Sequence, residues 1–177
     1  MLSATKRINL LMNWSDKKTV QKGDFAEAII HEFLESKGYV VYKPVTDSAH
    51  PFDKLAIRDK RNVIIAEVKA KAKRNYFPDT GIDVRHYNDY IAIMEKHNIP
   101  VFIFFVDEML GEIYGNFLSR LEREVVCECR GKELKYPREQ NGIIYFHMDN
   151  MQSVKKLTEA EIQHLKNKSE RGYEYLT

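Results

Sequence analysis

The sequence predicts an α/β protein with one mixed sheet, built in the order α-β-β-β-α-β. Three patterns predict this class. Apolar residues recur every three or four positions over 19–37, which indicates a helix. A β-hairpin is indicated next, with strands at 52–58 and 63–69 around a polar turn. A second helical pattern over 84–97 leads to the segment V-F-I-F-F-V at 101–106, which is typical of a buried central strand.

The other segments predict shorter elements. A short strand is predicted at 39–43, and the Pro- and Gly-containing residues 74–82 are predicted to be irregular. After the central strand, strands are predicted at 112–118, 124–128 and 142–148, a helical turn at 119–123, and a last helix from 158 to about 168 that opens on a capping box. The polar run 130–142 is predicted to be a loop.

The length of 177 residues fits a single domain with a sizeable core. Within it we distinguish three parts. Residues 1–18 form an N-terminal basic segment, residues 19–107 form the αβββαβ core, and residues 108–177 form a C-terminal β/α extension packed on that core.

Composition indicates a soluble globular protein, since 44% of the residues are hydrophobic and 31% are charged. No apolar run is long enough for a membrane span, and the apolar stretch 8–12 has no cleavage site after it, so we expect neither a membrane partner nor a secretory signal. The only cysteines, Cys127 and Cys129, form a C-x-C, which predicts reduced thiols of a cytoplasmic protein and argues against a disulfide framework or a zinc site.

Basic residues cluster although the net charge is only +2. One cluster lies within residues 1–22 and includes Lys22, and the other comprises Lys69, Lys71, Lys73 and Arg74. Such clusters contact phosphates or form an ordinary solvated surface, and both interpretations stay open for each cluster taken alone.

The second strand of the hairpin ends in charges that a buried strand should not carry. Residues two apart in a strand share a face, so Glu67 and Lys69 point the same way as Val63 and Ile65. Burying an unpaired charge costs on the order of several kcal/mol unless something compensates it. A divalent metal is one such compensation, with Asp53 on the partner strand as a second ligand.

A third acid belongs to this constellation. Glu27 borders the apolar stripe of the first helix instead of facing water. Phosphodiester hydrolysis requires a hydroxide, a neutralised nonbridging oxygen and a stabilised leaving group, which Mg²⁺ or Mn²⁺ supplies. Asp53 and Glu67, with the Val68 carbonyl, would hold the principal metal, and Glu27 would bind a second metal or orient its water. Lys69 would position or deprotonate the attacking water, or stabilise the developing charge.

These residues resemble the signature of the PD-(D/E)-x-K nuclease superfamily. Asp53, thirteen intervening residues and then Glu67-Val68-Lys69 match its D…(D/E)-x-K pattern. The segment K-G-D-F-A-E at 22–27 is similar to the first helix of archaeal Holliday junction resolvase-like members. The resemblance implies a restriction-endonuclease-like αβββαβ core and Mg²⁺-dependent cleavage of DNA, more as an endonuclease than as an exonuclease. It also implies a homodimer, and an active site formed by Glu27, Asp53, Glu67 and Lys69. If the hairpin strand continues, Lys71 and Lys73 stay on its charged face, and with Lys22 and Arg74 they are predicted contacts to the nucleic acid.

The chain departs from the family pattern in two places. The family has Pro directly before the Asp, whereas here Phe52 stands between Pro51 and Asp53. Either the strand starts one residue later, or Asp47 is a further metal ligand. Residues 108–177 have no counterpart in minimal resolvases. They would bind DNA, mediate dimerisation or recognise a sequence.

Three functions therefore compete. The first is a metal-dependent deoxyribonuclease, the second a non-catalytic nucleic-acid-binding or assembly protein on a nuclease-like fold, and the third a nuclease acting on RNA. Further candidates have ordinary structural alternatives: His50, His86 and Tyr87 as extra site residues, and Tyr76 and Phe77 as a stacking platform for an unpaired base or as loop anchors. No nucleophile elbow or Cys–His pair supports a serine or cysteine hydrolase.

Overall fold

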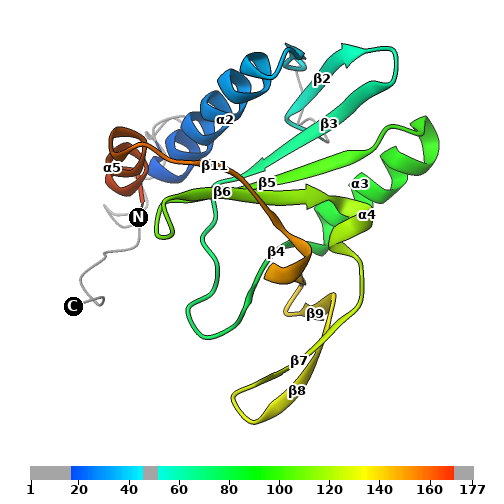
Figure 1. Ribbon diagram of the computed structural model, residues 1–177, viewed down its shortest axis with the longest axis vertical. Helices are drawn as coiled ribbons and strands as arrows, with labels where there is room; N and C mark the ends of the chain where they lie inside the picture. Colours follow the sequence, from blue (N-terminus) through cyan, green and yellow to red (C-terminus); the bar gives the residue numbers. More distant parts are fainter. Residues whose placement is uncertain (1–16, 46–51, 170–177) are drawn as a thin grey trace, which may run out of the picture.

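The computed structural model describes residues 17–45 and 52–169, and in these a six-stranded mixed sheet forms the centre (Figure 1). Its strands are, in spatial order, β1 (Val40–Tyr42), β2 (Lys54–Asp59), β3 (Asn62–Lys69), β5 (Val101–Asp107), β6 (Glu112–Phe117) and β11 (Gln152–Lys156). The pair β3 and β5 is parallel and the other neighbours are antiparallel. The predicted mixed sheet is confirmed.

Helices cover both faces of this sheet (Figure 1). On one face lie α2 (Lys18–Ser36) and α5 (Glu159–Asn167), and on the other lie α3 (Val84–His97) and α4 (Leu118–Leu121). The side chains of β3 alternate between the two faces of the sheet. Ile64, Ala66 and Val68 belong to the hydrophobic cluster under α2, and Ile65 belongs to the hydrophobic cluster under α3.

The hairpin β2–β3 and the crossover through α3 agree with the sequence pattern. Lys54 pairs with Ala66 and Ile57 with Val63, followed by a bulge before the turn. The second core helix covers 84–97 as predicted. The first hairpin strand begins at Lys54 and not at Phe52, so Asp53 immediately precedes it.

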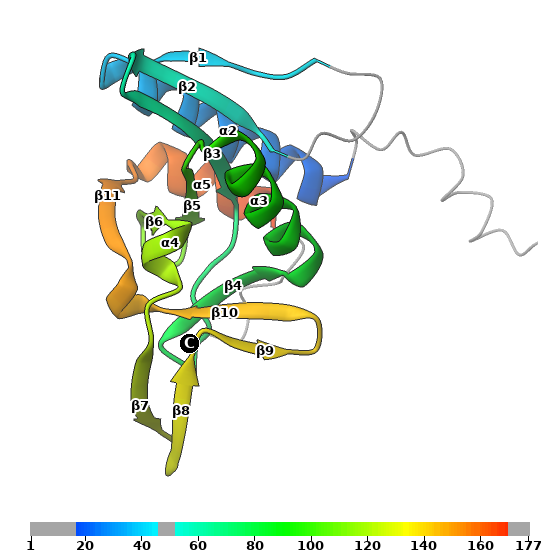
Figure 2. The same cartoon turned by 90° about the vertical axis from the view of Figure 1, so that its right-hand side faces the viewer.

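A second group of strands projects from the main sheet at the lower end of the molecule (Figures 1 and 2). We call it the arm, comprising residues 74–83 and 124–147. It contains one three-stranded sheet, β4 (Asp79–Asp83), β10 (Ile143–His147) and β9 (Arg138–Gln140), and one hairpin, β7 (Val125–Cys129) with β8 (Lys132–Tyr136). Both cysteines are free and lie on β7, as predicted.

Two predictions about this arm are wrong. Residues 79–82, within the segment predicted to be irregular, belong to β4, and the predicted loop 130–142 contains β8 and β9. In both cases the strand exists because a distant partner completes its ladder: Ile82 of β4 pairs with Ile144 of β10. Pro and Gly within a segment disfavour regular structure only until such a partner is present.

The chain after β5 returns to the main sheet. Strand β6 pairs with β5 along its whole length, and β11, which the pattern did not predict, adds the outer strand beside β6. Gly115 of β6 is required by close approach, since a Cβ there would lie 1.9 Å from the Ile103 carbonyl oxygen. The predicted capping box opens α5: Thr158 Oγ1 accepts from the Glu161 N–H, and the Glu161 carboxylate accepts from the Thr158 N–H.

No helix among the described residues has the length and apolarity needed to cross a membrane.

Replacing Gly23 by alanine is expected to raise the free energy of unfolding. Gly23 lies inside α2 and a Cβ there would meet nothing within 4 Å, so the gain in helix propensity, about 0.5–1 kcal/mol, is not opposed by a clash. Gly131→Ala is the matched control. It also has open space, but its φ of 71° disfavours a side chain, so this variant should lose stability. Urea denaturation of both variants measures the difference, and equal shifts would contradict the argument.

Candidate active site

Asp53 and Glu67 lie opposite each other where the hairpin enters the sheet. The pairing of Lys54 with Ala66 places Asp53 across from Glu67 and on the same face. The Asp53 N–H donates to Glu67 Oε2 over 3.3 Å, and the Val68 N–H donates to Asp53 Oδ2 over 2.7 Å. Glu67 is buried, with only 3% of its surface exposed, and Asp53 is partly buried. Two predicted ligands thus converge at one point.

The electrostatics of this pair favour a cation. Burial, and then the neighbouring charge of Glu67, raise the pKa of Asp53 to about 7, against the opposing hydrogen bond from Val68. Among the described residues, none donates a hydrogen bond to the second oxygen of Asp53, Oδ1. A pair of buried acids that repel each other, with an oxygen left over, suits a divalent metal.

Lys69 completes this side of the site. Its Nζ lies 2.7 Å from Glu67 Oε1 and 5.9 Å from the centre of the Tyr90 ring. Tyr90 reaches the site from α3 and is 1% exposed, and burial followed by the Glu67 carboxylate raises its pKa well above the ordinary value. Sequence reasoning missed Tyr90. The available signal was its position three residues after Tyr87 on the same helix.

Glu27 comes from the opposite face of the sheet. It lies on α2, and its Oε2 accepts from Lys43 Nζ and from Lys54 Nζ, both at 3.0 Å. The hydrogen bond to Glu27 is the main cause that raises the pKa of Lys43. Lys54 is almost completely buried, and it follows Asp53 in the chain, so its side chain points to the other face. Both lysines were missed, and strand parity was the signal for Lys54.

The structure brings two of the predicted carboxylate ligands together, Asp53 and Glu67. In residues 17–45 and 52–169, no group of three or more His, Cys, Asp or Glu side chains is placed to hold a metal ion. Mg²⁺ is commonly held by one or two carboxylates and completed by water. Asp53 and Glu67 fit that arrangement, and the Val68 carbonyl stays a predicted ligand. His50, Pro51 and Asp47, the other candidates near this site, lie outside the described residues.

The residues predicted to contact nucleic acid have partners within the chain. Lys22 Nζ lies 2.6 Å from Glu108 Oε1, and Lys71 Nζ donates to the Gly81 carbonyl over 2.8 Å. Lys73 Nζ donates to the Arg74 carbonyl, and the Arg74 guanidinium donates hydrogen bonds to both carboxylate oxygens of Asp79. These contacts fasten residues 70–74 to the arm. Contact with nucleic acid stays a prediction for all four.

Two further candidates on α3 have structural partners. The Tyr87 hydroxyl donates to the Glu122 carboxylate just after α4, and burial together with this contact raises the pKa of Tyr87 to about 12. The His86 ring lies 6.3 Å from the Tyr90 ring and 3.9 Å from Asp83.

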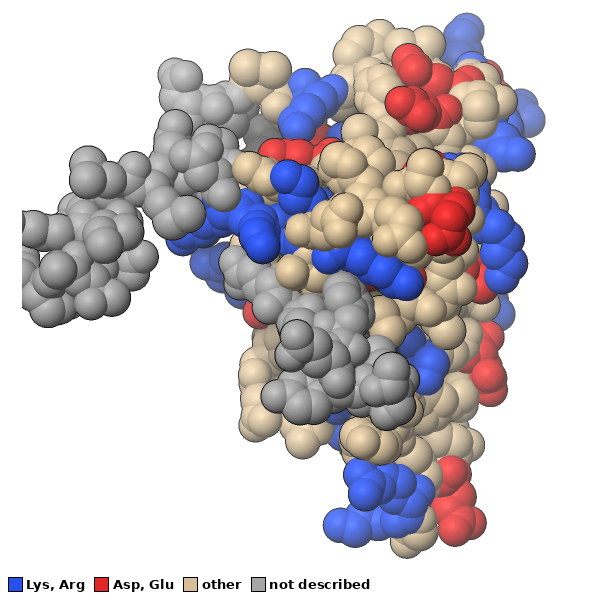
Figure 3. All heavy atoms as spheres, turned by 90° about the vertical axis from the view of Figure 1, so that its left-hand side faces the viewer, with Lys and Arg blue, Asp and Glu red and all other residues tan. Residues whose placement is uncertain are grey.

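Positive charge is unevenly distributed over the surface. Figure 3 shows Lys and Arg side chains gathered across the middle of one face, and a separate basic group at the lower end, where the arm ends in the hairpin β7–β8. An anionic partner would therefore meet positive charge at two places.

The architecture defines the class of the fold, which is restriction-endonuclease-like. A solved structure with this fold is Hjc from Archaeoglobus fulgidus, a Holliday junction resolvase from an archaeal hyperthermophile. It superimposes with a TM-score of 0.50 at 11% sequence identity, over 72% of this chain and 90% of that protein. A scan of protein-family models finds no match, and a search of curated protein sequences also finds none.

Proposed function

We propose that this protein is a metal-dependent nuclease that hydrolyses phosphodiester bonds of DNA. The observation that carries the proposal is the buried pair of Asp53 and Glu67, with Lys69 beside it, at the end of one hairpin. The fold shared with a Holliday junction resolvase supports DNA as the substrate and endonucleolytic cleavage as the mode.

Each residue has a distinct task in this proposal. Asp53 and Glu67 hold Mg²⁺ or Mn²⁺, and the Val68 N–H orients the Asp53 carboxylate through its hydrogen bond. A bound divalent ion supplies a nucleophilic hydroxide at neutral pH and neutralises charge on the phosphate. Lys69, held by Glu67, places an ammonium where it positions the attacking water or stabilises the developing negative charge. Tyr90 and Glu67 keep that lysine in place.

Glu27 makes two ion pairs in this geometry, and its role at a second metal stays a proposal. Its carboxylate holds Lys43 and Lys54, so that in this geometry it fixes two ammonium groups next to the hairpin. This ion triad favours the alternative function, a nucleic-acid-binding protein that does not cleave, because a structural Glu27 reduces the number of converging acids.

The remaining expectations from the sequence and the resemblance stand as proposals. They are a cytoplasmic location, a homodimer that cuts both strands, and a division into the basic segment 1–18, the nuclease core 19–107 and the extension 108–177.

A substrate panel tests the function. The full chain is incubated with supercoiled, linear, single-stranded and branched DNA, and with RNA, in Mg²⁺, Mn²⁺ or EDTA. We expect metal-dependent cleavage of at least one DNA, and its loss in Lys69→Met. Lys60→Met is the matched control, since it removes the same charge from the exposed turn at the far end of the hairpin.

Two outcomes would overturn the proposal. Cleavage that is equal in Lys69→Met and Lys60→Met would remove the assigned site. No cleavage of any substrate, together with tight binding in EDTA, would establish the non-catalytic alternative, and cleavage of RNA alone would change the substrate.

A further inference from the structure

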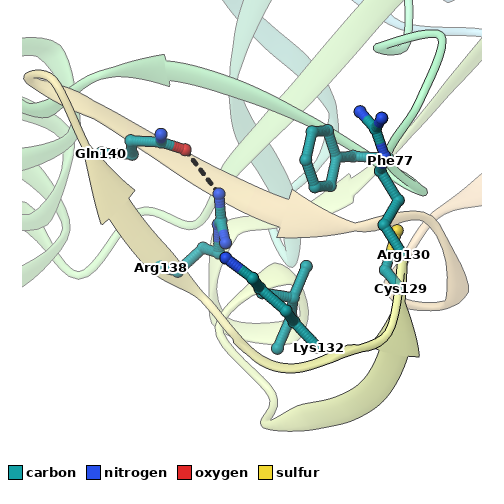
Figure 4. Close-up of a pocket in the computed structure, with 7 residues that line it drawn as sticks. Phe77, Cys129, Arg130, Lys132, Arg138 and Gln140 are labelled. Carbon is teal, nitrogen blue, oxygen red and sulfur yellow. Dashed lines mark hydrogen bonds between the residues drawn. The ribbon is translucent and has the colours of Figure 1, made fainter.

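The arm contains a pocket that the candidate active site does not use. It has a volume of about 370 Å³ and opens between the loop before β4, the hairpin β7–β8 and the short strand β9 (Figure 4). Its lining combines an aromatic ring with three cations and no acid: Phe77, Cys129, Arg130, Lys132, Leu134, Arg138 and Gln140.

The strand register explains why no acid lines the pocket. Cys129 pairs with Lys132 and Cys127 with Leu134, so these four side chains share the inner face of the hairpin. Glu128 pairs with Glu133 in the alternate position, on the outer face. The sequence of this hairpin is nearly balanced in charge, but its two faces are not.

Two of the pocket's cations lie over aromatic rings, one on Phe77 in the lining and one on Tyr76 next to it in the chain. The Arg138 guanidinium lies 5.6 Å from the centre of the Phe77 ring, and the Arg130 guanidinium lies 5.2 Å from the centre of the Tyr76 ring. Cys129 Sγ donates to the Tyr76 carbonyl over 3.3 Å and holds this aromatic pair against the hairpin. Tyr76 is nevertheless 72% exposed, and Arg138 has a buried Nε without a hydrogen-bond partner.

Exposed rings beside unneutralised cations are what an unpaired nucleotide requires. A base stacks on an aromatic face, and its phosphates need donors that no carboxylate already occupies. The inner face of the hairpin supplies both. An acidic or apolar protein surface would use only one of the two.

The arm is also within reach of a substrate held at the candidate active site. The eight residues 70–77 connect Lys69 to the pocket, and a fully extended chain of that length spans at most about 29 Å. One turn of a DNA duplex measures about 34 Å, so the pocket lies within one turn's length of the candidate active site.

We propose that the arm pocket binds an unpaired nucleotide of the substrate, with its base on Tyr76 and Phe77 and its phosphates at Arg130, Lys132 and Arg138. This rests on the proposed nuclease function and specifies its substrate class, which is DNA containing single-stranded or frayed segments. The arm thereby selects where the nuclease acts.

Binding of fluorescein-labelled oligothymidylate to the full chain in EDTA, followed by anisotropy, tests the pocket. Lys132→Gln is expected to reduce the dependence of log K on log salt by about 0.7, the value for one lost contact to a single strand. Lys135→Gln is the matched control, because it makes the same change on the same strand but on the outer face, where Lys135 pairs with Glu124. Tyr76→Leu should weaken binding by about fivefold or more.

Binding to a blunt, fully paired duplex should be nearly unchanged in Lys132→Gln and Tyr76→Leu. Equal effects of Lys132→Gln and Lys135→Gln, or equal losses on duplex and single strand, would overturn the proposal. Cleavage is measured separately in Mg²⁺. If cleavage depends on Lys69 while the arm variants bind normally, only the arm assignment fails, whereas an absence of cleavage counts against the nuclease function alone.

Discussion

The Asp53→Asn variant is expected to unfold at a higher temperature than the wild-type protein at pH 8 without metal, and to cleave no DNA. The pKa of Asp53 is about 7 in the folded protein, against an ordinary value of 3.8. Between these values the folded state binds more protons than the unfolded state, so this residue makes stability fall as pH rises from about 4 to 7. Above pH 7 the whole penalty is present, on the order of 2–4 kcal/mol.

Asparagine removes that penalty because it carries no charge, while its side-chain oxygen still accepts from the Val68 N–H. The stabilisation should shrink as the pH is lowered toward 4, where the wild-type carboxyl is protonated in the fold. Mg²⁺ should raise the melting temperature of the wild type and leave Asp53→Asn unchanged, because a ligand stabilises only the protein that binds it. The loss of cleavage should be about 10²–10³-fold, as for groups that stabilise the reaction's charge directly, which leaves no cleavage visible in the substrate panel.

Differential scanning fluorimetry from pH 4 to 9, with and without Mg²⁺, measures the first effect. Asp89→Asn is the control, since Asp89 is exposed on α3, and this variant should resemble the wild type in both assays. A less stable Asp53→Asn at pH 8 would show that the carboxylates do not repel each other in the folded protein. Retained cleavage would show that the metal is held elsewhere.

The Asp79→Asn variant is expected to lose about 2–3 kcal/mol of unfolding free energy, somewhat less than for a fully buried ion pair because Arg74 is partly exposed. Asp79 is fully buried and accepts two hydrogen bonds from Arg74 and one from the Tyr136 hydroxyl. The guanidinium itself lies between the rings of Phe77 and Tyr145. Asparagine keeps the shape of this junction but leaves the cation without its counter-charge.

The loss should be localised to the arm. Guanidinium denaturation measures the free energy of unfolding. Relative to the wild type, the variant should increase amide hydrogen exchange more in β4 and β8 than in β3 and β5. Asp83→Asn, at the exposed end of the same strand, makes the same chemical change where its only described partner is His86 at 3.9 Å, and should cost little. Equal losses in the two variants would contradict the assigned role of Asp79.

Local patterns predicted the part of the site that lies on one hairpin. Asp53 and Glu67 meet because residues two apart share a strand face and a short turn sets the register, and both properties are visible in the chain itself. The same locality explains why the range 84–97 of the second core helix and the capping box at Thr158 were predicted correctly.

Contacts across the fold were not predictable in this way. Periodicity placed Glu27 at the edge of an apolar stripe, but the face of the sheet on which α2 packs decides that Glu27 meets Lys43 and Lys54. In the same way, Arg74 belongs to a basic cluster in the sequence, and its carboxylate partner becomes apparent only when β4 pairs with β10.

The sequence by itself determined the αβββαβ order of the elements that build the main sheet, the pairing of Asp53 with Glu67 and the position of Lys69. These depend on spacing within one or two neighbouring elements. Only the tertiary structure decided that Glu27 pairs with Lys43 and Lys54, and that Tyr90 lies against Glu67. It also decided that the hairpin β7–β8 turns its basic face toward the pocket and its acidic face outward. The physical reason is that packing direction and long-range strand pairing depend on the sum of many weak contacts along the chain, which no single stretch of residues encodes.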